Sequence, residues 1–167
     1  MSRTSIPVAV VLDRVRSLYN VGAFFRTCDA AGVSRLHLAG YTGRPPDPRI
    51  SKTALGAEES VPWSHHATAG EAVDQLRAEG FQIAAIETTD DAIDIHEWRP
   101  KFPICAVFGN EVDGVPPEIS EAADVRVKIP MLGLKESLNV AVAGGVVLFE
   151  LLRKYRAAHE STKCGSD

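Results

Sequence analysis

The sequence predicts an α/β protein with a mainly parallel sheet flanked by helices. Uninterrupted aliphatic runs such as Val8–Leu12 and Ile104–Phe108 are typical of strands that are covered on both faces. Segments with apolar residues at helical spacing alternate with these runs along the chain, which is the pattern of a parallel sheet. The chain has 167 residues, of which 45% are apolar. We therefore expect one domain that buries its own core without metals or disulfides.

Strands are predicted where short apolar or alternating runs lie between turn signals. These runs are 8–12, 35–39, 61–63, 81–86, 104–108 and 125–129. Asn20 is a candidate N-cap, and Thr68 with Glu71 forms a capping box, so both residues predict helix starts. The expected helices span 20–32, 50–56, 68–80, 117–119 and a long stretch from Asn139. The acidic segment 87–103 has no periodic pattern and is expected to be irregular.

Composition excludes several classes of protein. No apolar run is long enough for a membrane span or a secretory signal, so we expect no membrane partner. The three cysteines, Cys28, Cys105 and Cys164, have no metal-ligand spacing, and the histidines are scattered. We therefore expect no metal site, and reduced thiols in a cytoplasmic protein.

Charge is distributed unevenly along the chain. Residues 1–52 contain eight Lys or Arg and only three Asp, although the formal net charge of the whole chain is -4. Four arginines of this region lie in or near the expected loops at strand ends, and we call them the four loop arginines: Arg14, Arg16, Arg44 and Arg49. They predict a surface that faces a polyanion, while solvated surface charge is the alternative explanation.

Two later loops follow buried strands and carry unusual polar residues. Gly109 and Gly114 let a ligand approach the main chain closely, and Glu111 would stand at the mouth of such a site. The loop 129–139 leads into the N-terminus of the last helix, where free backbone groups are available for a ligand. A capped strand-to-helix connection is the alternative for this second loop.

The first helix carries Gly22 and Arg26 one turn apart on one face. This spacing lets a bulky group approach the backbone and meet a guanidinium in a crevice, while a surface arginine above a helix start is the alternative.

Together these segments resemble the three motifs of the SpoU (TrmH) family of SPOUT RNA methyltransferases. The first two motifs match Asn20–Thr27 and Phe108–Gly114, and the third matches Ile129–Gly133 together with Ser137–Val140, in the order that the family has them. The resemblance implies a SPOUT-type fold in which the C-terminal part forms a deep trefoil knot around the cofactor site. It also implies a minimal, single-domain member, with a catalytic domain over 1–157 and a disordered tail over 158–167.

The resemblance further implies S-adenosyl-L-methionine as cofactor and a ribose 2′-hydroxyl of RNA as methyl acceptor. The substrate would be tRNA more readily than rRNA, and the four loop arginines would bind its backbone. The family's catalytic residues match Asn20, Arg26, Glu111, Ser137 and Asn139. The cofactor-binding positions correspond to Ile86, Phe108, Gly109, Glu111, Gly114, Ile129, Met131, Ser137 and Leu138.

The chemistry leaves the role of Arg26 open. The hydroxyl must lose its proton as the new bond forms, but a guanidinium has a pKa above ~12 and is an unfavourable base. Arg26 therefore either accepts the proton transiently or only stabilises developing negative charge. Two other functions remain open from sequence: a catalytically inactive knotted RNA-binding module, and a nucleotide-dependent α/β enzyme with other chemistry.

The apolar surface of the last helix predicts a homodimer, and the family resemblance implies the same. The helix presents more apolar surface than one side of a sheet needs, with two central glycines that allow close approach by another helix. The residues concerned are Val140, Gly144, Gly145, Val147, Leu148, Leu151 and Leu152. A helix that is fully buried in its own domain is the alternative.

Overall fold

The computed structural model describes residues 2–163 and has a seven-stranded sheet in which every strand pair is parallel. The strands are β1 (Ile6–Asp13), β2 (Val33–Ala39), β3 (Trp63–His66), β4 (Gln82–Ile86), β5 (Ile93–Asp94), β6 (Ile104–Phe108) and β7 (Val125–Lys128). Their order in the sheet is β3-β2-β1-β6-β4-β7-β5. The predicted fold class is confirmed, and the knot stays a prediction of the family resemblance.

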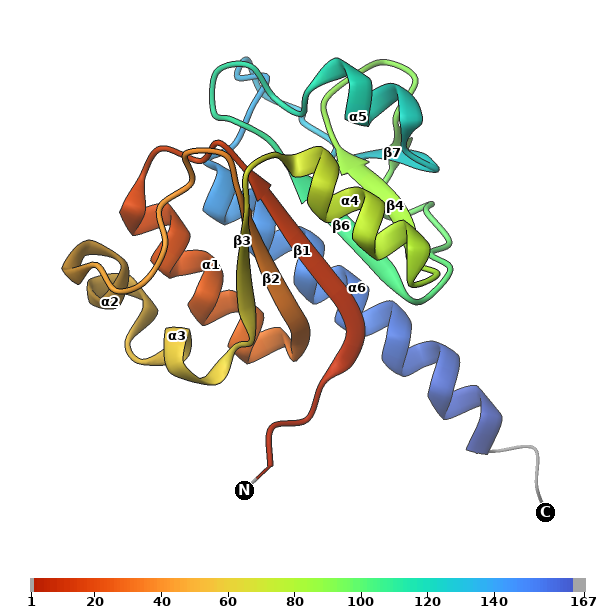
Figure 1. Cartoon of the computed structure of the whole chain (residues 1–167). Helices are drawn as coiled ribbons and strands as arrows, with labels where there is room; N and C mark the ends of the chain where they lie inside the picture. Colours follow the sequence, from red (N-terminus) through yellow and green to blue (C-terminus); the bar gives the residue numbers. More distant parts are fainter. Residues whose placement is uncertain (1, 164–167) are drawn as a thin grey trace.

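Helices cover both faces of this sheet (Figure 1). They are α1 (Leu18–Ala31), α2 (Pro48–Ala54), α3 (Ala57–Ser60), α4 (Ala69–Ala78), α5 (Pro117–Ala122) and α6 (Val140–Lys163). Strand β1 alternates between two cores: Val10 and Leu12 pack in the cluster beneath α1 and α6, whereas Val11 packs in the cluster beneath α4. In Figure 1, α6 accordingly runs behind β1 and α4 crosses in front of the sheet.

Helix α1 begins three residues earlier than predicted. Its N-cap is Ser17, whose hydroxyl accepts a hydrogen bond from the backbone N–H of Asn20 at 3.2 Å. Asn20 therefore lies in the first turn, and its side chain is available for another partner. The predicted end is confirmed, because Gly32 caps the helix in the left-handed conformation with φ 74°.

Gly22 does not face a crevice as its spacing with Arg26 predicted. A Cβ at Gly22 would lie 2.2 Å from the Ile50 carbonyl oxygen and 2.1 Å from the Thr53 hydroxyl. The bulky group that approaches this glycine is thus helix α2 of the same chain, and the prediction of a ligand there is wrong.

Several element boundaries differ from the prediction for local reasons. The expected helix 50–56 is divided into α2 and α3, because Leu55 and Gly56 both adopt positive φ. The short strand expected at 61–63 is β3, shifted to Trp63–His66 by its pairing with β2. The segment 87–103 contains β5, a two-residue strand that pairs with the edge of β7.

Helix α6 continues into the segment expected to be a tail. Residues 158–163 are helical, because this segment contains helix formers such as Ala158 and no Gly or Pro. Residues 164–167 of the expected tail, including Cys164, lie outside the described residues. None of the helices within 2–163 is long and apolar enough to cross a membrane.

Part of the apolar stripe predicted for a dimer interface on α6 faces the core instead, whereas Gly145 faces open space and the homodimer stays a prediction. Val147, Leu148 and Leu151 are completely buried, and Gly144 lies against the ring of Phe24 from α1. Helical spacing identifies an apolar stripe, but it does not say whether the same chain or another covers it. The outward face of α6 carries a different set of apolar residues: Val142, Val146 and Phe149.

Candidate active site

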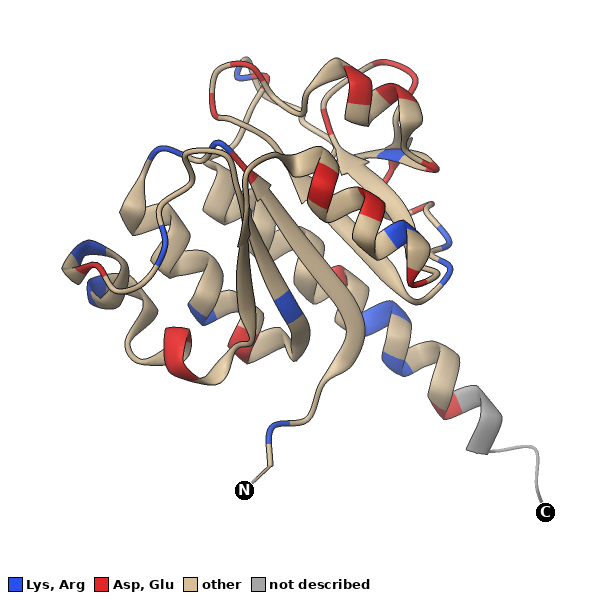
Figure 2. Cartoon of the chain, in the orientation of Figure 1, with Lys and Arg blue, Asp and Glu red and all other residues tan. Residues whose placement is uncertain are grey.

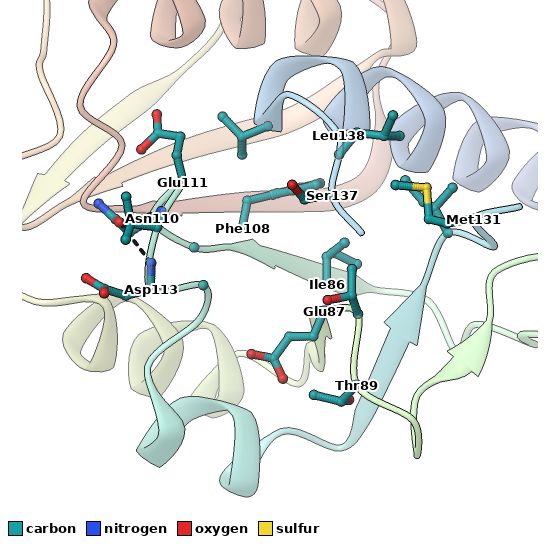
Figure 3. A pocket seen from close by; sticks show the side chains of 17 residues that line it. Ile86, Glu87, Thr89, Phe108, Asn110, Glu111, Asp113, Met131, Ser137 and Leu138 are labelled. Carbon is teal, nitrogen blue, oxygen red and sulfur yellow. Dashed lines mark hydrogen bonds between the residues drawn. The ribbon is translucent and has the colours of Figure 1, made fainter. Parts of the chain in front are cut away.

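A cavity of about 380 Å³ lies at the carboxyl ends of β4, β6 and β7. These three strands are neighbours in the sheet, with β4 in the middle, so the loops that follow them meet at one edge. All nine positions that the family resemblance assigned to the cofactor line this cavity: Ile86, Phe108, Gly109, Glu111, Gly114, Ile129, Met131, Ser137 and Leu138. Figure 3 shows Asn110 and Glu111 on one side of it, and Met131, Ser137 and Leu138 on the other.

The loop 110–114 is closed by one buried amide. Asn110 pairs with Gly114 through two backbone hydrogen bonds of 2.9 and 3.2 Å. Its side-chain oxygen accepts from the N–H groups of Val112 and Asp113 at 2.8 and 3.1 Å. These bonds hold Glu111 at the tip of a compact turn beside the cavity.

Gly109 is required by the close packing of this turn. A Cβ at this position would lie 2.0 Å from the carbonyl carbon of Gly114 and 2.2 Å from the backbone nitrogen of Val115. Both neighbours are main-chain atoms that cannot move aside, so any side chain at Gly109 would open the turn. By contrast, Gly133 in the loop 129–139 has nothing within 4 Å of such a Cβ.

The walls of the cavity are chemically divided. Phe108, Ile129 and Leu138 supply apolar surface, whereas acidic groups come from the loops after β4 and β6. One of these acids, Glu87, accepts a 2.5 Å hydrogen bond from the Ser120 hydroxyl and is fixed by it. Glu111 accepts a long bond of 3.4 Å from the backbone N–H of Arg16, which joins the cavity to the β1–α1 loop. An apolar slot with acidic groups at its mouth suits a flat ring that carries a positively charged chain.

Two further predicted catalytic residues meet at the edge of this region. The Asn139 side-chain amide donates to the Asn20 side-chain oxygen at 3.3 Å, which joins the start of α6 to the start of α1. The Asn139 oxygen caps α6 by accepting from the N–H groups of Ala141 and Val142. Since the Asn20 amide N–H groups have no acceptor among residues 2–163, they are available to donate to a substrate.

Arg26 is separated from the other predicted catalytic residues. Its side chain is exposed on α1, does not line the cavity, and makes no hydrogen bond or ion pair with any described residue. The sequence predicted that Arg26 lies beside the acceptor ribose and outside the cofactor pocket, and its place beside the ribose stays a prediction.

The four loop arginines differ in their partners. Arg14 is paired with Asp13 at 2.9 Å, and Arg49 is paired with Asp47 at 3.0 Å. Hydrogen bonding to these aspartates raises the pKa of both arginines above the ordinary value. Arg16 and Arg44 have no carboxylate partner within 4.0 Å among the described side chains. In Figure 2, positive segments gather on the β1–α1 loop and around α2, while negative ones gather on α4 and α5.

Sequence reasoning missed eight residues that line the cavity. They are Glu87, Thr88, Thr89, Asn110, Val112, Asp113, Val140 and Ala143. Most of them are direct neighbours of predicted residues, so the rule that ligands bind beyond strand ends could have found them. Within the described part of the chain, no cluster of three or more His, Cys, Asp or Glu side chains is arranged to hold a metal ion.

This geometry agrees with the relationship of the chain to known proteins. Residues 7–149 match the profile of the SpoU rRNA Methylase family. The chain belongs to this family. It is 37% identical over 154 residues to the tRNA (guanosine(18)-2′-O)-methyltransferase of Thermus thermophilus, an alignment that covers 92% of this chain and 78% of the relative.

Solved structures of SpoU proteins have the same fold. The A. aeolicus TrmH/SpoU tRNA modifying enzyme superposes with a TM-score of 0.85 and 31% identity, covering 95% of this chain and 80% of that one. The AdoMet-bound rRNA methyltransferase from Sinorhizobium meliloti superposes with a TM-score of 0.83 and 32% identity, covering 92% of this chain and 58% of that one. The match to an AdoMet-bound rRNA methyltransferase makes the cavity of this chain the candidate for a cofactor site.

Proposed function

We propose that this protein is an S-adenosylmethionine-dependent methyltransferase that methylates a ribose 2′-hydroxyl of RNA. The observation that carries the proposal is the convergence of all nine family-assigned cofactor positions on one cavity. These positions come from three separate loops, and their meeting depends on the order β6-β4-β7 in the sheet. Membership in the SpoU family and similarity to an AdoMet-bound relative support the same function.

The residues present fit S-adenosylmethionine. A cavity of about 380 Å³ is within the range of small-molecule sites. Phe108, Ile129 and Leu138 would hold the adenine ring. The missing Cβ at Gly109 makes room for the turn at Gly114 and Val115 and not for the ring, so the ligand approach expected at this glycine from the sequence is corrected. Glu87 and Glu111 offer carboxylates to the amino group and the sulfonium charge. When bound, the cofactor supplies an electrophilic methyl group.

The remaining polar residues would act on the acceptor. Asn20, held by Asn139, has free amide N–H groups to orient the ribose, and Ser137 lies on the rim of the cavity. Orientation is a large part of catalysis here, because in-line displacement demands that the hydroxyl oxygen face the methyl group. A positive group is needed near the hydroxyl to stabilise charge as its proton leaves, and Arg26 is the family's residue for this task.

Arg26 can fulfil this role in a homodimer. The outward face of α6, which packs beside α1, carries exposed apolar residues, of which Val142 is 53% and Phe149 is 48% exposed. Gly145 leaves open space on α6 for the approach of a second helix. Arg26 is exposed on α1, outside the cavity of its own protomer, so we propose that it serves the cavity of the second protomer.

A complementation experiment tests this arrangement. Arg26→Ala and Gly109→Ala should each be inactive alone. The first variant lacks the arginine, and in the second the opened turn removes the cofactor cavity. Mixing them through refolding should restore about a quarter of wild-type activity, because half of the dimers are mixed and each has one complete site. No restoration from a dimeric mixture would mean that Arg26 acts within its own protomer. A monomer in light scattering would exclude the arrangement altogether.

The preferred substrate class is tRNA, with rRNA as the second possibility. The Thermus and A. aeolicus relatives act on tRNA, and the Sinorhizobium relative is an rRNA methyltransferase. The family also implies a trefoil knot around the cavity, and the free thiols of Cys28 and Cys105 support a reducing, cytoplasmic setting.

The direct test is methyl transfer from labelled S-adenosylmethionine to total tRNA and, separately, to rRNA, followed by mass spectrometry of the nucleosides. A 2′-O-methylated nucleoside is expected in tRNA. Gly109→Ala should abolish cofactor binding, while the matched control Gly133→Ala, in open space, should retain it. Cofactor binding without transfer would support an inactive RNA-binding module. Binding of neither cofactor nor RNA would support a different nucleotide-dependent chemistry.

A further inference from the structure

An exposed aromatic ring lies beside the cavity without a role in the chemistry above. Tyr41 follows β2 and is 54% exposed, although tyrosine rings are usually more deeply buried. Its hydroxyl accepts a hydrogen bond of 2.7 Å from the Asn110 amide and another of 3.3 Å from Arg16 Nε. Since Asn110 lines the cavity, the Tyr41 ring is one hydrogen bond away from the cavity wall.

The position of Tyr41 is fixed by its neighbours. Thr42, the next residue, is buried and donates from its hydroxyl to the Leu12 carbonyl at 3.2 Å. The same hydroxyl accepts from the Val15 N–H at 3.0 Å, so the start of the loop after β2 is tied to the end of β1. Two polar contacts at the hydroxyl then hold the ring from its other end. An exposed ring that is held at both ends loses little conformational entropy when a ligand binds.

The charge beside the ring suits a nucleic acid. The Arg16 guanidinium lies 5.8 Å from the ring centroid. No carboxylate of the described part of the chain lies within 4.0 Å of it, so its charge is available to a ligand. A guanidinium beside an exposed ring is a combination that binds single-stranded RNA, because the ring stacks on a base and the cation attracts the phosphate.

We propose that Tyr41 is the stacking platform for an unpaired base of the RNA, adjacent to the nucleotide that is methylated. The inference rests on the proposed function, and it names the substrate class of the same site: RNA that is single-stranded or looped beside the acceptor. A base within an A-form duplex is already stacked on its neighbours and cannot use the ring. Arg16 and Arg44 would contact phosphates on either side of the stacked base.

The test measures the affinity of the wild-type protein and of the Tyr41→Leu variant for two RNA probes. Leucine at this position keeps apolar bulk but removes the aromatic face. The probes are a hairpin RNA with an unpaired loop and the blunt duplex made from its stem. Affinity for the hairpin should fall roughly 5- to 100-fold, the scale for the loss of one stacked base. Affinity for the duplex should stay unchanged. The salt dependence of hairpin binding should keep its slope, because no phosphate contact is lost.

Two further variants separate stacking from other effects. Tyr41→Phe keeps the ring and should retain most of the hairpin affinity. Trp63→Leu is the matched control, since Trp63 is 37% exposed but begins β3, at the opposite edge of the sheet from the cavity. It should leave RNA binding unchanged.

The outcomes distinguish this inference from the proposed function. If the wild-type protein neither binds the hairpin nor methylates RNA, both fail. If it does both and Tyr41→Leu behaves like wild type, or weakens duplex and hairpin equally, only the stacking role is overturned. Cofactor affinity should be the same in Tyr41→Leu as in Tyr41→Phe, since both lack the hydroxyl that accepts from Asn110, and a further loss in Tyr41→Leu would also count against stacking.

Discussion

Replacing Gly144 with alanine should destabilise the protein although alanine is the better helix former. A Cβ at Gly144 would lie 2.4 and 2.6 Å from two ring carbons of Phe24. Carbon atoms in contact prefer roughly 3.5–4.0 Å, so the ring has to move by about 1 Å. Phe24 is only 1% exposed and packs edge-on against Phe108 with ring centroids 5.1 Å apart. The displacement is therefore passed to a residue that lines the cavity.

The magnitude follows from two opposing terms. Overpacking a core costs about 1–3 kcal/mol, whereas glycine to alanine in a helix contributes about 1 kcal/mol of stability. A net loss of about 1 kcal/mol should lower the Tm by about 2–4 °C for a chain of this size. The control is Gly70→Ala in α4, where the nearest atom, the Thr68 hydroxyl, would be an ordinary 3.7 Å away. That variant should raise the Tm by a similar amount.

Calorimetry and a cofactor titration measure both consequences. Gly144→Ala should bind S-adenosylmethionine several-fold more weakly through the displaced Phe108, while Gly70→Ala should bind it normally. Phe24→Leu, introduced together with Gly144→Ala, provides space for the new methyl group and should recover part of the loss, so that the two changes are not additive. A rise in Tm for Gly144→Ala equal to that of Gly70→Ala would show that the contact argument is wrong.

Three more predictions concern charge. Arg26→Ala should leave cofactor affinity unchanged in a titration and lower methyl transfer by about 10²- to 10⁴-fold, and Arg26→Lys should stay far below wild type because it lacks the planar fork. Among the four loop arginines, Arg16→Ala and Arg44→Ala should each reduce the salt slope of RNA binding by about one unit, and an unchanged slope would place the RNA elsewhere. Burial, the neighbouring His66 and Arg35 lower the pKa of His37 from 6.5 to about 4. As the pH falls, His37 is therefore protonated in the unfolded chain before it is protonated in the folded protein. Up to about 3 kcal/mol of the free energy of unfolding should be lost between pH 6.5 and 4. Acid unfolding measures this loss, and His37→Phe should reduce it.

The sequence was sufficient for the features that local patterns encode. The aliphatic runs that became β1 and β6 and the glycine that ends α1 depend on nearby residues only, and each was found. The nine positions expected to bind the cofactor line one cavity because the family motifs follow directly after neighbouring strands, and their contact with the cofactor stays a prediction. The two-residue strand β5 was missed because it depends on β7, a partner more than 30 residues away along the chain, as its pairing of Ile93 with Val127 shows.

Other failures arose where a pattern has two physical solutions. Gly22 permits close approach, but sequence alone does not tell whether a ligand or helix α2 approaches. The stripe of Val147, Leu148 and Leu151 predicts burial, but not whether the covering surface belongs to the same chain. Ser17 and Asn20 are both good caps, and only the actual start of the helix selects between them.

The Asn110 side chain has a consequence for how the two substrates bind. Its oxygen accepts two hydrogen bonds from the loop 110–114, and its amide donates to the Arg14 carbonyl and to the Tyr41 hydroxyl at 2.8 and 2.7 Å. All four of its hydrogen-bonding positions are therefore used, two within the loop that lines the cavity and two toward the loops of Arg14 and Tyr41. The loop 110–114 therefore cannot shift without straining the loops of Arg14 and Tyr41, and the reverse also holds. Thermodynamic linkage then requires reciprocity: if occupancy of the cavity changes the affinity for RNA, RNA changes the affinity for the cofactor by the same factor.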